Sequence, residues 1–191
     1  MSSIDGSARK EKPEIKVRSF RAPKHPHLFE ALGKQRIGQS FCFLCGRRIT
    51  QNNRSDEHVF PKWLLHRYKL WDLELTLLNR TSIRYRNLTI PCCKVCNTRH
   101  LAPIENRMKR ATAKGPHAVR RLSNHTLFLW LGKILYGILY KEGLLKVDRR
   151  KERSGRIVPR RLLENFRTHH LFLQGARIPM RFVGAFPASI F

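Results

Sequence analysis

Two cysteine pairs with the same short spacing constrain this chain more than any other feature. Cys42 and Cys45 form the first pair, Cys93 and Cys96 form the second, and two residues separate the members of each pair. Four thiolates in this arrangement are typical of a closed tetrahedral site that staples distant parts of a chain together. The sequence therefore predicts a structural Zn²⁺ site with these four cysteines as ligands.

The residues around the pairs predict how each cysteine is used. Gly46 permits a tight turn in which backbone N–H groups point at the cysteine sulfurs, and we expect residues 41–45 to form a strand that enters this turn. Cys92 is the fifth cysteine. Only its neighbour Cys93 has the two-residue spacing from Cys96, so we expect Cys92 to be a small buried side chain. An exchange of roles between Cys92 and Cys93 stays open at this point.

The charge of the chain indicates the class of partner. Lys and Arg number 39 against 13 Asp and Glu, which gives a formal net charge of +26. Such an excess repels itself unless the protein binds a polyanion. The basic residues run along the whole chain and are not gathered in one amphipathic helix, which favours nucleic acid over a membrane surface.

Cysteine usage and hydropathy indicate the compartment. Residues 1–16 lack the apolar region of a secretory signal, and paired cysteines without such a signal favour metal binding in a reducing cytoplasm over disulfides. The apolar run 127–140 is shorter than the roughly 20 residues of a membrane span and contains Lys133. We therefore expect a cytoplasmic protein with a buried helix over residues 124–140.

Composition divides the chain into three parts. Residues 1–27 are rich in Lys, Arg and Pro and predict a flexible basic arm that gains order on nucleic acid, or a disordered tail without function. Residues 28–115 contain both cysteine pairs and form the predicted zinc-containing module. Residues 116–191 are basic, and we expect a helix followed by short strands.

Inside the zinc-containing module, apolar spacing predicts two helices with a strand between them. The first helix starts at Pro61 and carries apolar residues as far as Trp71, and residues 80–90 alternate as in a strand. Leu101 and Met108 lie on one face of the second helix. Because Pro103 loses a backbone hydrogen bond inside a helix, this helix begins near residue 102 or has an irregular first turn.

A polar motif lies between the two cysteine pairs. It consists of Glu57-His58 with Pro61 shortly after, Asn87-Leu88 before the second pair, and Asn97 directly after Cys96. In this order the motif resembles the HNH endonucleases of the His-Me finger group, over residues 41–110. The resemblance implies an α+β fold in which a ββα-metal finger is stapled by the four-cysteine zinc site, with an additional C-terminal α+β segment.

The resemblance also implies an activity, namely metal-dependent hydrolysis of phosphodiester bonds in nucleic acid, with DNA expected over RNA. His58 would be the general base, because a neutral imidazole accepts a proton from water at cellular pH. Glu57 and Asn97 would hold one Mg²⁺ or Mn²⁺ ion through oxygen ligands, which offsets charge on the phosphate. Asn87 would support the loop that positions His58.

Several roles stay open in the sequence. Asp56 could replace Glu57 as the ligand. His100 could reach the same ion, which would favour a softer metal such as Mn²⁺, Ni²⁺ or Zn²⁺, or it could be a surface residue. His58 could be a helix cap or surface histidine, and Asn97 could merely cap the helix after the zinc turn.

Basic residues close to the motif in the sequence are the predicted contacts to phosphates. They are Arg54, Lys62, Arg84, Arg86, Lys94 and Arg99. The larger aromatic residues are assigned to the core and not to base stacking. They are Trp63, Tyr68, Trp71, Trp130, Tyr136 and Tyr140. The alternative functions are a non-catalytic zinc-ribbon protein that binds nucleic acid and a structural subunit of a ribonucleoprotein.

Overall fold

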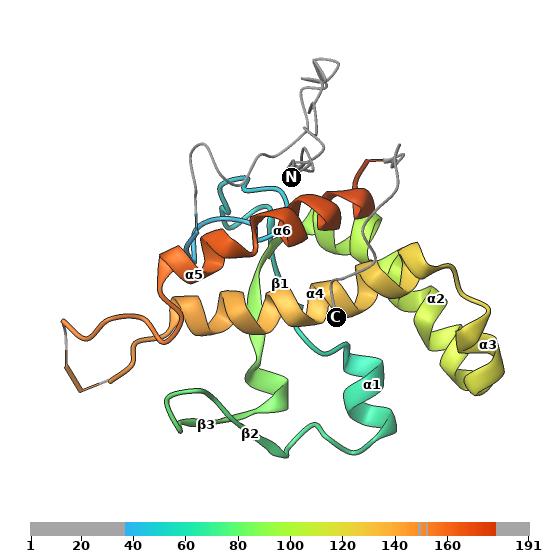
Figure 1. The fold of residues 1–191 in the computed structure, drawn as a ribbon, viewed down its shortest axis with the longest axis horizontal. Coiled ribbons are helices and arrows are strands. Elements are labelled where there is room, and N and C mark those ends of the chain that lie inside the picture. Colours follow the sequence, from blue (N-terminus) through green and yellow to red (C-terminus); the bar gives the residue numbers. More distant parts are fainter. Residues whose placement is uncertain (1–36, 149, 152, 179–191) are drawn as a thin grey trace, which may run out of the picture.

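The structure is a computed structural model that describes residues 37–148, 150–151 and 153–178. These residues form an α+β fold, as expected (Figure 1). The strands are β1 (Arg54–His58), β2 (Glu74–Thr76), β3 (Ser82–Arg84) and β4 (Thr89–Cys93). The α-helices are α1 (Lys62–Arg67), α2 (Ala102–Ala113), α3 (Pro116–Arg120), α4 (Asn124–Leu144), α5 (Arg160–Asn165) and α6 (Arg167–Leu173). Three further helical turns are η1 (Tyr85–Asn87), η2 (Cys96–Leu101) and η3 (Gln174–Ala176).

The strands pair in two small antiparallel sheets. β1 pairs with β4 so that Arg54 lies opposite Cys93 and His58 lies opposite Thr89. β2 pairs with β3 in a separate hairpin. The continuous strand predicted for residues 80–90 is wrong, because the turn η1 interrupts it, with the Leu88 N–H donating to the Tyr85 carbonyl at 3.1 Å.

A two-stranded sheet has too little apolar surface to be stable alone, and α4 covers it. This helix packs on β4, α2, α5 and α6 and runs through the middle of the molecule (Figure 1). At Gly137 the helix approaches the sheet so closely that an added Cβ would lie 3.1 Å from the side chain of Val59. The helix predicted over residues 124–140 is confirmed and extends to Leu144. None of the described helices combines the length and apolar character of a membrane span.

The first cysteine pair lies in a turn and not on a strand. Phe41 forms only a single bridge, with Arg48, so the predicted strand over residues 41–45 is wrong. The turn is attached to β4 instead, because the Phe43 N–H donates to the Pro91 carbonyl at 2.9 Å. This contact brings the first pair beside the second.

The helices of the zinc-containing module differ from the prediction at their ends. α1 starts after Pro61 but ends at Arg67, and Lys69 has a φ of 54°, so Trp71 lies beyond the helix. Two alternatives were predicted for the second helix, a start near residue 102 and an irregular first turn, and the structure has both. The wide turn η2 precedes α2, and Pro103 lies in the first turn of α2, where its missing N–H costs no hydrogen bond.

The C-terminal part is helical where strands were expected. Residues 167–176 form α6 and η3, which corrects the prediction of short strands there. The buried residues His170, Leu173 and Gln174 have helical spacing, but two of them are polar, so the apolar pattern alone concealed the helix. The arm at residues 1–27 and the end at residues 179–191 lie outside the described residues.

One hydrophobic core crosses the predicted boundary at residue 115. It contains Leu88 and Ile90 from the zinc-containing module together with Leu129, Tyr136 and Leu173 from the C-terminal part. The C-terminal helices therefore complete the core on which the sheet rests.

Candidate zinc centre and histidine site

The four cysteines of the two pairs converge on one point. The Sγ atoms of Cys42, Cys45, Cys93 and Cys96 all lie within 4.8 Å of one another. Tetrahedral Zn–S bonds of about 2.3 Å place sulfurs about 3.8 Å apart, and the Cys45 and Cys93 sulfurs are 3.7 Å apart. The donor set thus fits a metal such as zinc, and the predicted pairing of the cysteines is confirmed.

Backbone geometry explains how the first pair turns toward the metal position. Gly46 has a φ of 61°, a left-handed conformation that glycine adopts without strain. Its N–H donates to the Cys42 carbonyl at 2.8 Å, and the Cys42 N–H donates to the Arg47 carbonyl at 2.9 Å. Cys92 is fully buried, and its sulfur lies 3.9 Å from that of Cys42, outside the group of four. Cys93, and not Cys92, is therefore the candidate ligand.

The thiols of the cluster differ in the direction in which their pKa values are shifted. Hydrogen bonds from Cys42, Cys45 and Cys96 lower the pKa of the Cys93 thiol. Hydrogen bonding with Cys42 and Cys93 raises the pKa values of Cys45 and Cys96. Because zinc ligands are thiolates, a divalent metal would displace the protons of the thiols whose pKa is raised.

Helix α6 holds the turn between Cys42 and Cys45. The His170 Nε2 donates to the Phe43 carbonyl at 2.8 Å, and the Gln174 Nε2 donates to the Leu44 carbonyl at 2.8 Å. Both side chains are buried and lie one helical turn apart. Burial lowers the pKa of His170 to about 4, so the ring is neutral at pH 7. No local pattern links these residues to the first cysteine pair, which they follow by more than 120 positions.

His58 ends β1 and lies at the opposite end of the strand pair from Cys93. Its half-buried imidazole stacks near Trp71, with ring centroids 5.9 Å apart. Burial lowers the pKa of His58, and the charges of Lys62 and Lys133 lower it further. The imidazole is therefore neutral at pH 7 and can accept a proton. Trp71 also stacks on His66 of α1 at 4.5 Å, a neighbour that the motif did not indicate.

Glu57 has a partner that the sequence analysis did not foresee. Its carboxylate is buried and lies 2.6 Å from the Nζ of Lys133. The same Nζ is 2.6 Å from Glu105 of α2 and donates to the His58 carbonyl at 3.0 Å. Burial raises the pKa of Glu57 to about 7 against the lowering effect of Lys133. The two carboxylates together outweigh burial and raise the pKa of Lys133, so the ammonium stays charged.

The two asparagines of the motif lie apart from each other. The Asn97 Nδ2 donates to the Ser55 Oγ at 2.8 Å, which fixes η2 to β1. Asn87 is exposed in η1, where its backbone carbonyl accepts a hydrogen bond from Lys141 at 3.2 Å. It supports the turn through main-chain contact with α4, whereas side-chain hydrogen bonds were expected.

The imidazole of His100 lies near the C-terminal turn η3. The Ala176 backbone is its hydrogen-bond partner, and burial followed by the charge of Arg177 lowers its pKa. Asp56 is exposed and pairs with Arg54 at 3.3 Å. Neither residue belongs to the cysteine cluster.

The two predicted ligands of a catalytic divalent ion each make a polar contact within the fold. A cation already contacts the Glu57 carboxylate, and the Asn97 amide is bound to a hydroxyl group. Among the described residues, only the four cysteines form a group of three or more His, Cys, Asp or Glu donors that could hold a metal. Lys133 was not predicted as the partner of Glu57, although a lysine within an apolar run indicates a buried charge.

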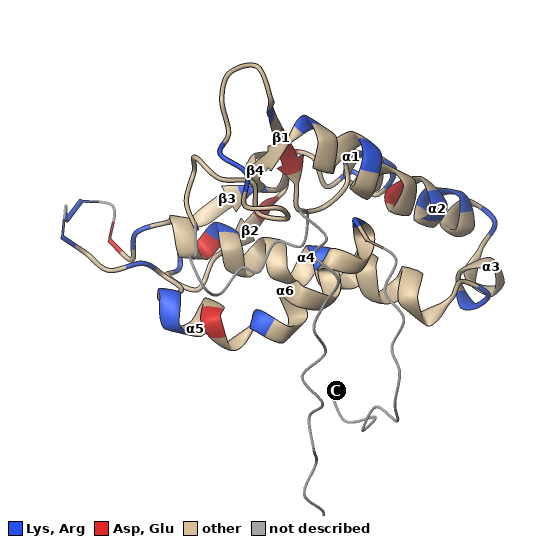
Figure 2. Ribbon diagram, turned by 90° about the horizontal axis from the view of Figure 1, so that it is seen from above, with Lys and Arg blue, Asp and Glu red and all other residues tan. Residues whose placement is uncertain are grey.

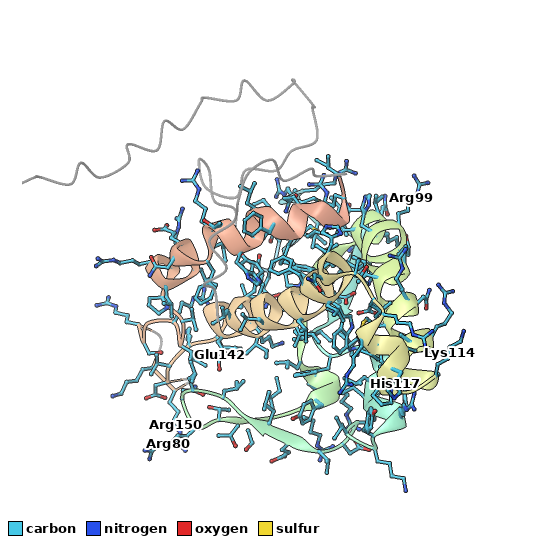
Figure 3. All side chains as sticks on the ribbon, turned by 45° about the vertical axis from the view of Figure 1, so that its right-hand side comes forward. Arg80, Arg99, Lys114, His117, Glu142 and Arg150 are labelled. Atoms are coloured by element: carbon cyan, nitrogen blue, oxygen red, sulfur yellow. The ribbon has the colours of Figure 1, made fainter. Side chains whose placement is uncertain are left out.

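Basic side chains cover the surface around these sites. The predicted phosphate contacts Arg54, Lys62, Arg84, Lys94 and Arg99 are exposed, and Arg86 is half-buried beside Asp72. Lys and Arg gather along α1, α2 and α3 (Figure 2). Arg99 lies toward one end of this edge, and Lys114 and His117 lie toward the other (Figure 3). These exposed cations meet the requirement of a surface that binds a polyanion.

The aromatic residues are only partly in the core. Tyr136 and Tyr140 are buried, as expected, whereas Tyr68 is 55% exposed, which corrects its assignment. Trp63 and Trp130 are half-buried and stack with ring centroids 6.4 Å apart.

Comparison with protein-family models, with curated proteins and with solved structures gives no match to this chain. The functional interpretation therefore rests on the residues and their geometry.

Proposed function

We propose that this chain hydrolyses phosphodiester bonds in nucleic acid, with DNA as the first substrate to test, through an HNH-type ββα finger. The observation that carries the proposal is the neutral imidazole of His58 on a strand that β4 and the cysteine cluster hold in place. β1, β4 and the helical segment that follows Cys96 supply the two strands and the helix of such a finger.

His58 would take a proton from the attacking water, since its lowered pKa keeps the ring neutral at pH 7. Lys62, the basic residue whose charge acts most strongly on that ring, would attract the phosphate and offset its negative charge. A zinc ion on the four cysteines would fix the chain around both strands. A catalytic Mg²⁺ or Mn²⁺ would supply Lewis acidity, and the assay below includes both ions.

The test is cleavage of plasmid DNA by the full chain with Mg²⁺, Mn²⁺ or EDTA. His58→Ala should reduce cleavage at least about a hundredfold, the range of a lost general base. It should retain DNA affinity and zinc content. The matched control is His125→Ala, which removes an exposed imidazole in the first turn of α4. Equal loss of cleavage in both variants would refute the proposal. A His58→Ala variant that cleaves as fast as the wild type would refute it as well.

A second candidate is a zinc-stapled protein that binds nucleic acid without cutting it. The observation that favours it is the contact of the Glu57 carboxylate with Lys133, which places a protein cation beside the predicted ligand of the divalent ion. Under this alternative the wild type binds DNA or RNA with a steep salt dependence and cleaves neither with any divalent ion. Fluorescence anisotropy across a salt series, run beside the cleavage assay, separates the two candidates.

A further inference from the structure

Lys133 is a buried cation shared by three elements. It belongs to α4 and is 2% exposed, yet its Nζ reaches oxygen atoms of β1 and α2. The contacts are 2.6 Å to Glu57, 2.6 Å to Glu105 and 3.0 Å to the His58 carbonyl. An ammonium group has three N–H donors. Each donor therefore has one oxygen partner, and the group is saturated.

Without this ammonium, the two carboxylates would face each other with no positive charge between them. Glu57 and Glu105 contact the same Nζ from different elements, and the charge of Glu105 adds to burial in raising the pKa of Glu57. Both carboxylates lie 2.6 Å from the same Nζ atom, and like charges held this close together away from water repel strongly. Two carboxylate oxygens and a carbonyl oxygen around one point are also the donors that hard divalent cations prefer. The position between Glu57 and Glu105 is thus a cation site, and the chain fills it with its own side chain.

We infer that Lys133 is the resident cation of this two-carboxylate site and a positioning residue for His58. Glu57 and Glu105 then hold the ammonium, and Glu57 is not a ligand of an exchangeable divalent ion. The ammonium fixes the carbonyl of His58, the residue at which β1 ends. The role at His58 rests on the proposed function, whereas the cation site itself does not.

The decisive experiment removes the ammonium and asks whether a divalent ion takes its place. Lys133→Met keeps an unbranched side chain one atom shorter than lysine and leaves both carboxylates facing an uncharged group. Zinc-loaded protein is titrated with MnCl₂ by calorimetry, and the melting temperature is measured with and without MnCl₂. The variant should bind Mn²⁺ at least about tenfold more tightly than the wild type, since it gains a pair of carboxylate ligands. Mn²⁺ should also raise its melting temperature.

Two further variants show where the added Mn²⁺ binds. Lys133→Met combined with Glu105→Gln should lose the gain in Mn²⁺ affinity. Lys141→Met removes an ammonium of the same helix that donates to the carbonyls of Asn87 and Thr89, and it should show no gain. All variants retain the four cysteines, so Mn²⁺ binding there cancels in the comparison. The inference is overturned when Lys133→Met binds Mn²⁺ no more tightly than the wild type. It is also overturned when Glu57→Gln binds Mn²⁺ more weakly than the wild type.

Lys133→Met could unfold, and a neutral triple variant keeps the inference testable in that event. Lys133→Met with Glu57→Gln and Glu105→Gln removes all three charges together. It should melt at a higher temperature than Lys133→Met alone, because no uncompensated carboxylate remains. A triple variant that is less stable than Lys133→Met refutes the resident-cation role.

The positioning role has its own readout in the cleavage assay. Lys133→Met should lower kcat at least about tenfold with little change in KM for DNA, because the DNA-contacting surface is intact while the His58 backbone is released. Lys133→Arg retains the positive charge and should recover part of that loss. Absence of cleavage by the wild type would refute the proposed function alone, and the Mn²⁺ measurements would still decide the cation site.

Discussion

The contact between His170 and the Phe43 carbonyl gives the zinc turn a stability that depends on pH. The buried ring is neutral when folded, with a pKa of about 4 against an ordinary value of 6.5. Between these two pH values the unfolded chain binds a proton at this position and the folded chain does not. The free energy of unfolding therefore decreases as the pH falls through this window, and the contribution of His170 is fully present only above about pH 6.5.

The magnitude follows from the two pKa values. A tenfold change in proton affinity corresponds to about 1.4 kcal/mol. The fall from 6.5 to about 4 therefore amounts to about 3 kcal/mol lost at pH 4, which is a large share of the stability of a small domain. Urea unfolding at several pH values between 7 and 4, followed by the fluorescence of the three tryptophans, measures this loss.

The matched variant is His170→Gln, whose amide N–H can donate to the same carbonyl but does not titrate. Acid also releases zinc from thiolates in this pH range, and the wild type and the variant share that loss. The difference between their two pH profiles is therefore the contribution of His170. Equal profiles, or a wild type that loses less stability than His170→Gln on acidification, would refute the reasoning.

Two further predictions concern the cysteine cluster and the sheet. Cys45→Ser should bind less than about one tenth of the wild-type zinc and unfold the turn, because three thiolates no longer close the site. Cys92→Ser should keep its zinc, as metal analysis and circular dichroism would show. Gly137→Ala should destabilise the fold by about 1–3 kcal/mol because its Cβ would lie 3.1 Å from Val59. Gly155→Ala, where no heavy atom lies within 4 Å, should have little effect in the same thermal unfolding assay.

The elements with a strong local signal could be predicted from the sequence. The four-cysteine cluster followed from cysteine spacing and the helix α4 from a long apolar run, whereas the α+β class was implied by the resemblance to the HNH endonucleases. The strands predicted at Phe41 and over residues 167–176 were wrong, because short apolar runs do not distinguish strands from turns or buried helices. In the second case the tertiary contacts of His170 and Gln174 decided the outcome.

The candidate site could be predicted only within the zinc-containing module. The resemblance to the HNH endonucleases identified Glu57 and His58 as part of one motif with the cysteine pairs, and both residues lie on β1. No local pattern relates Glu57 to Lys133, which follows it by 76 residues, and the polar partner of a buried carboxylate is set by packing. The lysine inside the apolar run did indicate a buried charge, but not the residues that neutralise it.

The C-terminal helices are part of the candidate site because the sheet alone is too small to position it. β1 and β4 have five residues each, and a two-stranded sheet of that size is marginal in water. α4 covers this sheet, and its Lys133 donates to the His58 carbonyl. α6 holds the turn of the first cysteine pair, because its His170 donates to the Phe43 carbonyl. The cysteines join β4 to that turn, and the helices fix the direction in which both present their side chains. A change in α4 or α6 should therefore alter the histidine site without touching the HNH-like motif itself.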